Sequence, residues 1–325
     1  MLQHIRRQIG FVMVVTLAAP LLVACGGEPT AQPQGSEPQG TITASGAFAL
    51  YPMMVKWGEE YQKQHPGVQF DISAGGAGKG MTDALGGQVD IGMVSREIKP
   101  EEDQKGAYWV SVVKDAVFPG VNEKNPVLND LLSKGVSREQ FIDIFINGKI
   151  KTWGELVGRP EITDEIHVYT RSDAAGAPET WAKYLGNKKQ EDLLGIGVFG
   201  DPGIAEAVAK DPLGIGYNNL GYAYDPASGE PVAGLVMLPV DANGSDQAEA
   251  DEVLDNKAQA IQAVASGKYP SPPARALNLV TKGKPSGLLQ DFILWTLTDG
   301  QKFVDSAGYI PLTPELLSEG LQKVK

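Results

Sequence analysis

Two arginines stand where they could hold an anion. Arg171 opens the run RSDAAGAP (residues 171–178), which continues with small side chains and ends in a proline, and Arg96 follows a serine after a short apolar stretch. A guanidinium group matches a tetrahedral oxyanion in pairs of charge-assisted hydrogen bonds. Small residues around Gly176 would let a ligand reach backbone N–H groups that larger side chains shield. The alternatives are an exposed turn for the first stretch and, for Arg96, an ion pair with Glu97 or another acid.

A third stretch, SAGGAGKG (residues 73–80), offers backbone N–H groups in a glycine-rich turn. It fails the nucleotide-binding P-loop pattern at both ends. Ser73 stands where that pattern requires glycine, and Gly80 stands where it requires a metal-binding serine or threonine. We therefore interpret the stretch as a plain glycine turn with Lys79 at its edge.

These stretches follow short apolar segments that we predict to be β-strands. The four segments span residues 41–44, 69–72, 90–94 and 166–170. Helical patterns come after the loops, and this alternation is typical of an α/β protein with mostly parallel sheets. Ligands bind beyond the carboxyl ends of strands in open α/β sheets. The four strand ends therefore predict one shared site.

Helices are expected directly behind two of these loops. Pro52 and Pro178 each suit the first position of a helix, and the two helices should run to about His65 and Gly186. The free N–H groups and the positive dipole end of such a helix favour an anion. Later helices begin near Ser286 and Thr313, and their apolar faces indicate core packing, not ligand binding.

Composition narrows the range of partners. The 325-residue chain has 42% hydrophobic and 21% charged residues, which is typical of a globular protein long enough for two domains. Its formal net charge is −12. This acidity argues against a nucleic-acid partner. It also means that an anion site must bind through local contacts, because the overall field repels anions.

The N-terminus reads as a secretion signal. Residues 1–24 carry two arginines before a short apolar run, and the only cysteine, Cys25, follows small residues that mark cleavage. The stretch ending at Cys25 resembles a bacterial lipoprotein signal, which implies that Cys25 carries lipid. Residues 25–40 contain no large apolar side chain and should form a flexible tether. We expect an extracytoplasmic, membrane-anchored protein, in the periplasm or on the outer cell surface.

Enzymatic chemistry has little support in the sequence. Of three histidines, His4 falls in the signal, and neither His65 nor His167 has a second histidine at metal-ligand spacing. No serine lies in a G-x-S-x-G nucleophile elbow, although a Ser-His-Asp arrangement assembled across space stays open. We expect no metal, no cofactor and no catalytic residue.

Taken together, the motifs resemble those of the PstS-like phosphate-binding proteins of bacterial ABC transporters, over nearly all of residues 41–323. The segments that carry the resemblance are ITASGAFALYPMMVKWGEEYQKQHPGV, GGQVDIGMVSREI, FINGKIKTWGEL, DPLGIGYNNLGY and LVTKGKPSGLLQDFILWTLTDGQKFVDSAGYIPL. The resemblance implies a two-domain periplasmic-binding-protein (Venus flytrap, type II) fold with two mostly parallel sheets and a two-strand hinge. It further implies a monomer that captures phosphate in the interdomain cleft and delivers it to an ABC permease.

The chain divides at two predicted crossover segments, residues 116–121 and 234–240. The first lobe should consist of residues 40–115 together with 245–325, and the second lobe of residues 116–244.

The resemblance assigns the anion ligands to the four loops, at Ser45, Ala47, Phe48, Gly76, Ala77, Ser95, Arg96, Arg171, Ala175, Gly176 and Ala177. Well-studied phosphate binders have hydroxyl residues where this chain has Gly76, Ala175 and Ala177, and an aspartate near Ser95. A carboxylate there rejects sulfate, which carries no proton to donate, so this site should be less selective. Another tetrahedral oxyanion (sulfate, molybdate or tungstate) therefore stays open as the ligand.

Two other functions stay open as well: a sensor or adhesin lipoprotein, and a secreted phosphatase. Replacing Arg171 by alanine should weaken binding and spare the fold.

Overall fold

The computed structural model describes residues 38–325, which belong to one compact unit. The predicted signal sequence, the lipidation site Cys25 and most of the tether lie outside the described residues. Within the described part, no helix is both long enough and apolar enough to cross a membrane.

The first part of the chain is an α/β arrangement, as predicted. β1 (Gly40–Gly46) pairs in parallel with β2 (Val68–Ala74) and with β3 (Ile91–Val94), which confirms three of the predicted strands. Three helices accompany them: α1 (Tyr51–Gln64), α2 (Ala77–Gly86) and α3 (Pro100–Gln104). Pro52 lies in the first turn of α1, where its missing N–H costs no hydrogen bond.

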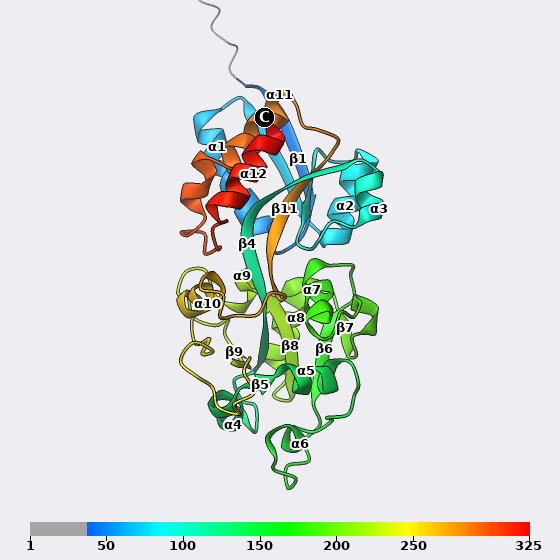
Figure 1. The fold of residues 1–325 in the computed structure, drawn as a ribbon, viewed down its shortest axis with the longest axis vertical. Helices are drawn as coiled ribbons and strands as arrows, with labels where there is room; N and C mark the ends of the chain where they lie inside the picture. The colour runs from blue at the N-terminus through cyan, green and yellow to red at the C-terminus, as the bar shows by residue number, and fades with distance from the viewer. Residues whose placement is uncertain (1–37) are drawn as a thin grey trace, which may run out of the picture. The chain divides into compact units, whose positions relative to one another are not determined.

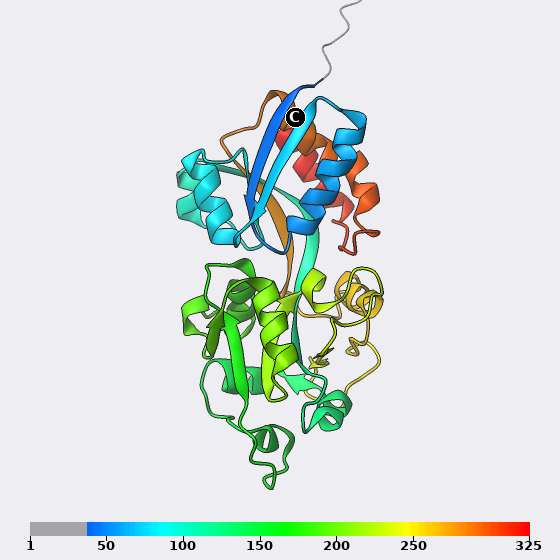
Figure 2. The ribbon, with the colours of Figure 1, turned by 180° about the vertical axis from the view of Figure 1, so that it is seen from behind.

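A long strand connects this region to the rest of the fold. β4 (Ala107–Asn122) pairs antiparallel with β11 (Ala274–Lys282) through residues 107–116 and with β8 (Gly214–Asn219) through residues 117–121. Figures 1 and 2 show β4 and β11 running side by side. The strands that we expected in two sheets therefore form one hydrogen-bonded path, β2-β1-β3-β11-β4-β8-β6-β7, in which β6 is His167–Arg171 and β7 is Ile196–Val198, and β9 (Leu235–Met237) pairs with β4. A small second sheet joins β10 (Val240–Asp241) to β5 (Val136–Ser137).

The middle of the chain supplies the remaining elements. They are α4 (Leu128–Lys134), β5 (Val136–Ser137), α5 (Arg138–Phe145), α6 (Trp153–Val157), β6 (His167–Arg171), α7 (Gly176–Tyr184), the 3-10 helix Gln190–Asp192, β7 (Ile196–Val198), α8 (Gly200–Lys210), α9 (Leu220–Ala223), β9 (Leu235–Met237), β10 (Val240–Asp241) and α10 (Lys257–Ala265). β6 is the fourth predicted strand, and α7 is the helix expected behind residues 171–178.

The C-terminal segment follows β11 with α11 (Gly287–Thr296), the 3-10 helix Asp299–Phe303 and α12 (Pro314–Val324). Thr313 caps α12 by accepting a hydrogen bond from the N–H of Leu316. Phe292 and Ile293 of α11 are buried in the core that also holds β1 and β3, so this segment serves packing, as the sequence indicated.

Buried apolar side chains form two separate cores, which define two lobes. The first core draws on residues 42–113 and 277–324, and the second draws mainly on residues 116–274. Leu254, Ala260 and Ala263 belong to the second core, and the hydroxyl of Tyr269 donates to the carbonyl of Val117 at 2.6 Å. The sequence had placed residues 245–274 in the first lobe. In the structure the chain returns to the first lobe through β11, because β9, in the predicted crossover, pairs with β4 inside the second lobe.

Candidate functional site

The four loops predicted from the sequence meet at the carboxyl ends of β1, β2, β3 and β6. The N–H of Gly78, behind β2, donates to the carbonyl of Ala174, behind β6, at 3.0 Å. The guanidinium carbon of Arg171 lies 5.3 Å from the centre of the Phe48 ring, which belongs to the loop after β1. Two lobes thus contribute to one cluster of loops.

Two glycines allow this close approach. A Cβ atom on Gly176 would lie 2.2 Å from the hydroxyl oxygen of Ser95 and 2.3 Å from its carbonyl oxygen. Gly76 has a φ of +90°, and a Cβ atom there would lie 2.7 Å from Oδ2 of Asp173. Larger residues at either position would push the first-lobe loops away from residues 171–177.

Some backbone amides at this junction are free to bind a ligand. Within residues 38–325, no protein acceptor bonds the N–H groups of Phe48, Ala77, Gly176 and Ala177. Three of these groups open α2 and α7, where the first N–H groups of a helix have no intrahelical acceptor. The junction therefore combines two helix N-termini with one loop amide, an arrangement that suits an anion.

Other residues predicted to bind are already engaged. The hydroxyl of Ser45 donates to Asp83 at 2.6 Å. The N–H of Ala47 donates to the carbonyl of Met93 at 2.9 Å, the N–H of Gly76 to the carbonyl of Gly46 at 3.0 Å, and the N–H of Ala175 to Oε1 of Gln190 at 3.1 Å. The structure brings these four residues to the junction, but their donors hold the loops together.

Arg171 is buried between two carboxylates of its own lobe. Its Nε donates to Oδ1 of Asp173 at 2.7 Å, and one terminal nitrogen donates to Oδ2 of Asp201 at 2.6 Å. The other terminal nitrogen donates to Oδ2 of Asp173, so two of the five guanidinium N–H groups remain. Burial alone would lower the pKa of Arg171, but Asp201 and Asp173 hold that pKa above its ordinary value.

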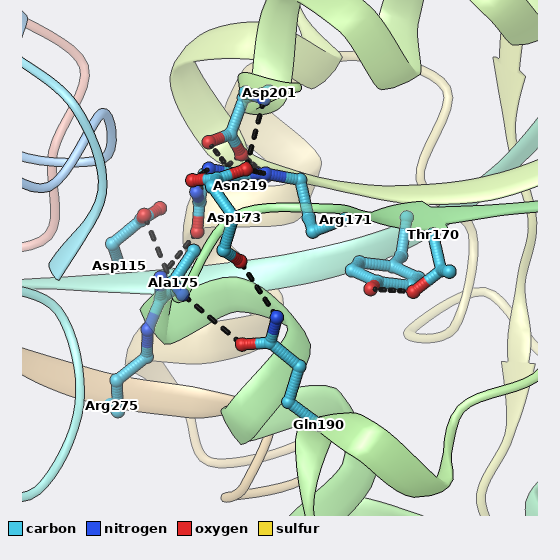
Figure 3. Close-up of polar contacts among 11 residues, drawn as sticks. Asp115, Thr170, Arg171, Asp173, Ala175, Gln190, Asp201, Asn219 and Arg275 are labelled. Carbon is cyan, nitrogen blue, oxygen red and sulfur yellow. Dashed lines mark hydrogen bonds and ion pairs between the residues drawn. The ribbon is translucent and has the colours of Figure 1, made fainter. Parts of the chain in front are cut away.

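A polar network continues from Asp201 to the first lobe (Figure 3). The backbone N–H of Asn219 donates to Oδ1 of Asp201 at 3.3 Å, and Arg275 donates to the side-chain oxygen of Asn219. Arg275 also lies 3.2 Å from Asp115 and donates from Nε to the carbonyl of Ser95 at 3.1 Å. This network fixes the end of β3 relative to β6 and β8.

Sequence reasoning missed Asp115, Asp201 and Arg275 in this network. Asp115 and Arg275 lie inside strands β4 and β11, and Asp201 is in the first turn of α8. Neither Asp115 nor Arg275 follows a glycine-rich loop. The available signal was a charged residue within an apolar segment, because such a charge needs a buried partner.

Arg96 occupies a different environment from the one predicted. Its terminal nitrogens donate to Glu102 at 2.8 and 2.6 Å and to the carbonyl of Glu97 at 2.9 Å, and its Nε lies 3.2 Å from Glu179. Three of its five N–H groups thereby donate to protein oxygens, and its Nε takes part in an ion pair. A cavity of about 610 Å³ lies beside it, lined among others by Lys99, Trp109 and Arg275.

Residues 38–325 contain no group of three or more His, Cys, Asp or Glu side chains that could hold a metal ion. His167 pairs with Asp211 at 2.7 Å, but it begins β6, at the opposite end of that strand from Arg171.

Comparison with known proteins gives a consistent result. Residues 31–300 match the family model described as PBP superfamily domain. The Phosphate-binding protein PstS of Methanocaldococcus jannaschii is 27% identical, with 98% of this chain and 96% of that protein aligned. The Bacillus subtilis protein of the same name is 26% identical over 93% of this chain and 94% of that protein.

A solved structure shares the fold. The putative phosphate ABC transporter substrate-binding protein of Clostridium perfringens, solved with bound phosphate, has a TM-score of 0.68 at 24% identity, over 84% of this chain and 100% of that one. The three relatives are named for binding, and none is named as an enzyme.

Proposed function

The chain belongs to the PBP superfamily domain family, and from that premise we propose that it is an extracytoplasmic receptor that binds phosphate between its lobes and delivers it to an ABC permease. The observation that carries the proposal is the meeting of four strand-end loops at the unbonded amides of Phe48, Ala77, Gly176 and Ala177, beside Arg171. The names of the aligned relatives support phosphate as the anion.

The anion would be held by local dipoles more than by net charge. Arg171 carries one positive charge, but Asp173 and Asp201 supply two negative charges next to it. The amides at the N-termini of α2 and α7, with the two remaining N–H groups of Arg171, then provide the favourable interaction. Each hydrogen bond gains strength where the lobes exclude water. This accounts for an anion site in a protein whose formal net charge is −12.

Of the remaining sequence-based ligand candidates, Ser95 fits this proposal and Arg96 does not. The hydroxyl of Ser95 lies at the junction, against Gly176, and no protein atom within residues 38–325 accepts a hydrogen bond from it. Most donors of Arg96 are bonded to protein oxygens. We therefore keep Ser95 among the ligands and assign Arg96 another role below.

Calorimetric titration tests the proposal. The protein from Gly26 onward is titrated with phosphate, sulfate, arsenate, molybdate and tungstate. We expect one phosphate per chain and weaker binding of sulfate. Absence of binding by all five anions, or turnover of a chromogenic phosphate ester, would overturn the proposal. Loss of phosphate uptake in cells without the gene would support delivery to a permease over a sensor or adhesin.

The membrane anchor is proposed separately. Cys25 is the only cysteine and follows the apolar run of residues 11–24. Labelling of growing cells with a fatty acid should mark the parent protein and leave a Cys25→Ser variant unlabelled. Equal labelling of both would remove Cys25 as the lipid attachment site.

A further inference from the structure

Three ion pairs connect the segment after β3 in the first lobe to α7 in the second lobe. Nε of Arg96 lies 3.2 Å from Oε2 of Glu179, and Nζ of Lys99 lies 3.1 Å from Oε1 of the same carboxylate. Nζ of Lys183 lies 2.6 Å from Oε1 of Glu97. We call these five residues the interlobe latch.

The opposite charges of the interlobe latch face each other in only one position of α7 along the first-lobe segment. The first-lobe segment presents a negative charge at Glu97 between positive charges at Arg96 and Lys99. α7 presents Glu179 and Lys183, which are four residues apart and so lie on one face of the helix. A shift of one helical turn would bring like charges together, so the pairs select one position of α7 against the first lobe.

The ion pairs of the interlobe latch differ in how far their side chains are buried, and burial determines how much each pair contributes. The side chain of Arg96 is 6% exposed and that of Glu179 is 27% exposed, whereas Glu97 in the outer pair is 82% exposed. Exposed pairs contribute little because water and salt screen them. The pair between Arg96 and Glu179 should therefore dominate the interlobe latch.

Arg96 is held ready for this contact by its own lobe. Glu102 of α3 accepts hydrogen bonds from both terminal nitrogens of Arg96 and from the N–H of Lys99. The guanidinium group is thereby fixed with its Nε edge toward the second lobe. Little side-chain entropy remains to be lost when Glu179 arrives.

The interlobe latch acts next to the proposed anion site. Glu179 belongs to the first turn of α7, whose opening residues Gly176 and Ala177 offer their free amides. Holding Glu179 keeps that helix end against Ser95. It also neutralises a carboxylate that would otherwise weaken the attraction of the helix N-terminus for an anion.

We propose that Arg96 and Glu179 are positioning residues, which do not contact the anion but hold α7 against the first lobe and so set how long a bound anion stays. This rests on the proposed function only for its effect on the anion. The contact between the lobes can be tested without any ligand.

Glu179→Gln is the main variant, because it removes one charge and keeps the size of the side chain. We expect phosphate to dissociate about tenfold faster with little change in the association rate, since losses of close contacts appear mostly in dissociation. Glu206→Gln is the matched control, because Glu206 pairs with Lys210 on α8, within one lobe. If Arg96 were instead a ligand, freeing its Nε would leave binding equal or tighter, and that result would overturn the proposal.

Exchanging the charges of the outer pair, Glu97 and Lys183, distinguishes loss of this contact from general damage to the fold. Glu97→Lys and Lys183→Glu should each speed phosphate dissociation slightly, and the double variant should restore the parent rate. Additive losses in the double variant would show that the outer pair does not act across the lobes.

The ligand-free test uses distances between spin labels at Glu59→Cys on α1 and Glu191→Cys in the second lobe, in the cysteine-free protein from Gly26. Without phosphate, Glu179→Gln should broaden the distance distribution relative to both the parent and Glu206→Gln. Identical distance distributions would overturn the proposal that the interlobe latch holds α7 against the first lobe. A broadened distribution in a protein that binds no oxyanion would support the interlobe latch and refute only the proposed function.

Discussion

Arg96 and Arg171 occupy equivalent places in the sequence pattern, yet the structure uses them differently. Each follows an apolar strand, each is buried, and each contacts two carboxylates. Both carboxylates of Arg171, Asp173 and Asp201, belong to its own lobe. Arg96 has Glu102 in its own lobe and Glu179 in the other. A charge satisfied within one lobe is a fixed part of a site, whereas a charge shared between lobes responds to their arrangement.

The two arginines also differ in what surrounds the donors that remain. Arg171 keeps two N–H groups for a ligand and lies against the ring of Phe48. Arg96 also donates three N–H groups to protein oxygens, and its Nε faces Glu179 of the other lobe at 3.2 Å. What the remaining N–H groups face, the Phe48 ring and the junction or a carboxylate of the other lobe, therefore separates a candidate ligand residue from a positioning residue better than the residue type does.

The largest effect is expected from Arg171→Ala. It should weaken phosphate binding at least about a hundredfold, because charge-assisted hydrogen bonds are lost. It should also destabilise the fold by about 3 kcal/mol, because Asp173 and Asp201 stay buried without their cation. The sequence alone suggested that the fold would be spared. Titration with phosphate and urea unfolding of the same variant distinguish the two expectations.

Gly176→Ala should have an intermediate effect. The added Cβ atom would meet backbone and hydroxyl atoms of Ser95 and would separate α7 from the first lobe. We expect a loss of phosphate affinity of about tenfold to a hundredfold, with α7 itself intact because alanine is a good helix former. The control is Gly221→Ala, since a Cβ atom on Gly221 meets nothing within 4 Å. Equal affinities for the two variants would contradict the close contact.

The smallest effect is expected on the stability of the fold at low pH. Burial tends to raise the pKa of Glu102, but hydrogen bonds from Arg96 and from the N–H of Lys99 lower that pKa below its ordinary value. The stabilisation from this group is fully present above the ordinary pKa of glutamate and is lost as pH falls through the lower folded-state pKa. Urea unfolding of Glu102→Gln should therefore show a flatter acid loss of stability than the parent. Parallel pH profiles would mean that Glu102 does not contribute.

Sequence patterns were sufficient to predict the features that depend on neighbouring residues along the chain. Strand ends, the start of α1 near Pro52 and the loop that begins with Arg171 follow from apolar periodicity and from small residues near strand ends. The α/β class followed from the same alternation. Free amides at Gly176 and Ala177 could be anticipated because the first residues of a helix have no intrahelical acceptor.

What the patterns could not supply is long-range pairing. Glu179 lies far along the chain from Arg96, and the sequence left open which acid, if any, this arginine meets. Arg275 carries no loop signal, and the return of residues 254–274 to the second core depends on packing of α10 and Tyr269. Each of these contacts is decided by three-dimensional packing, which spacing in one sequence does not encode.

The continuous pairing of β4 limits how the lobes can move. Ala116 is paired with Ala274 of β11, and the next residue, Val117, is paired with Asn219 of β8. No unpaired residue of β4 therefore lies between the part that pairs with the first lobe and the part that pairs with the second. Any reorientation must twist a hydrogen-bonded ribbon instead of swinging a loose linker. Twisting this ribbon would store elastic energy, which the ion pairs of the interlobe latch would have to offset in order to hold the lobes together.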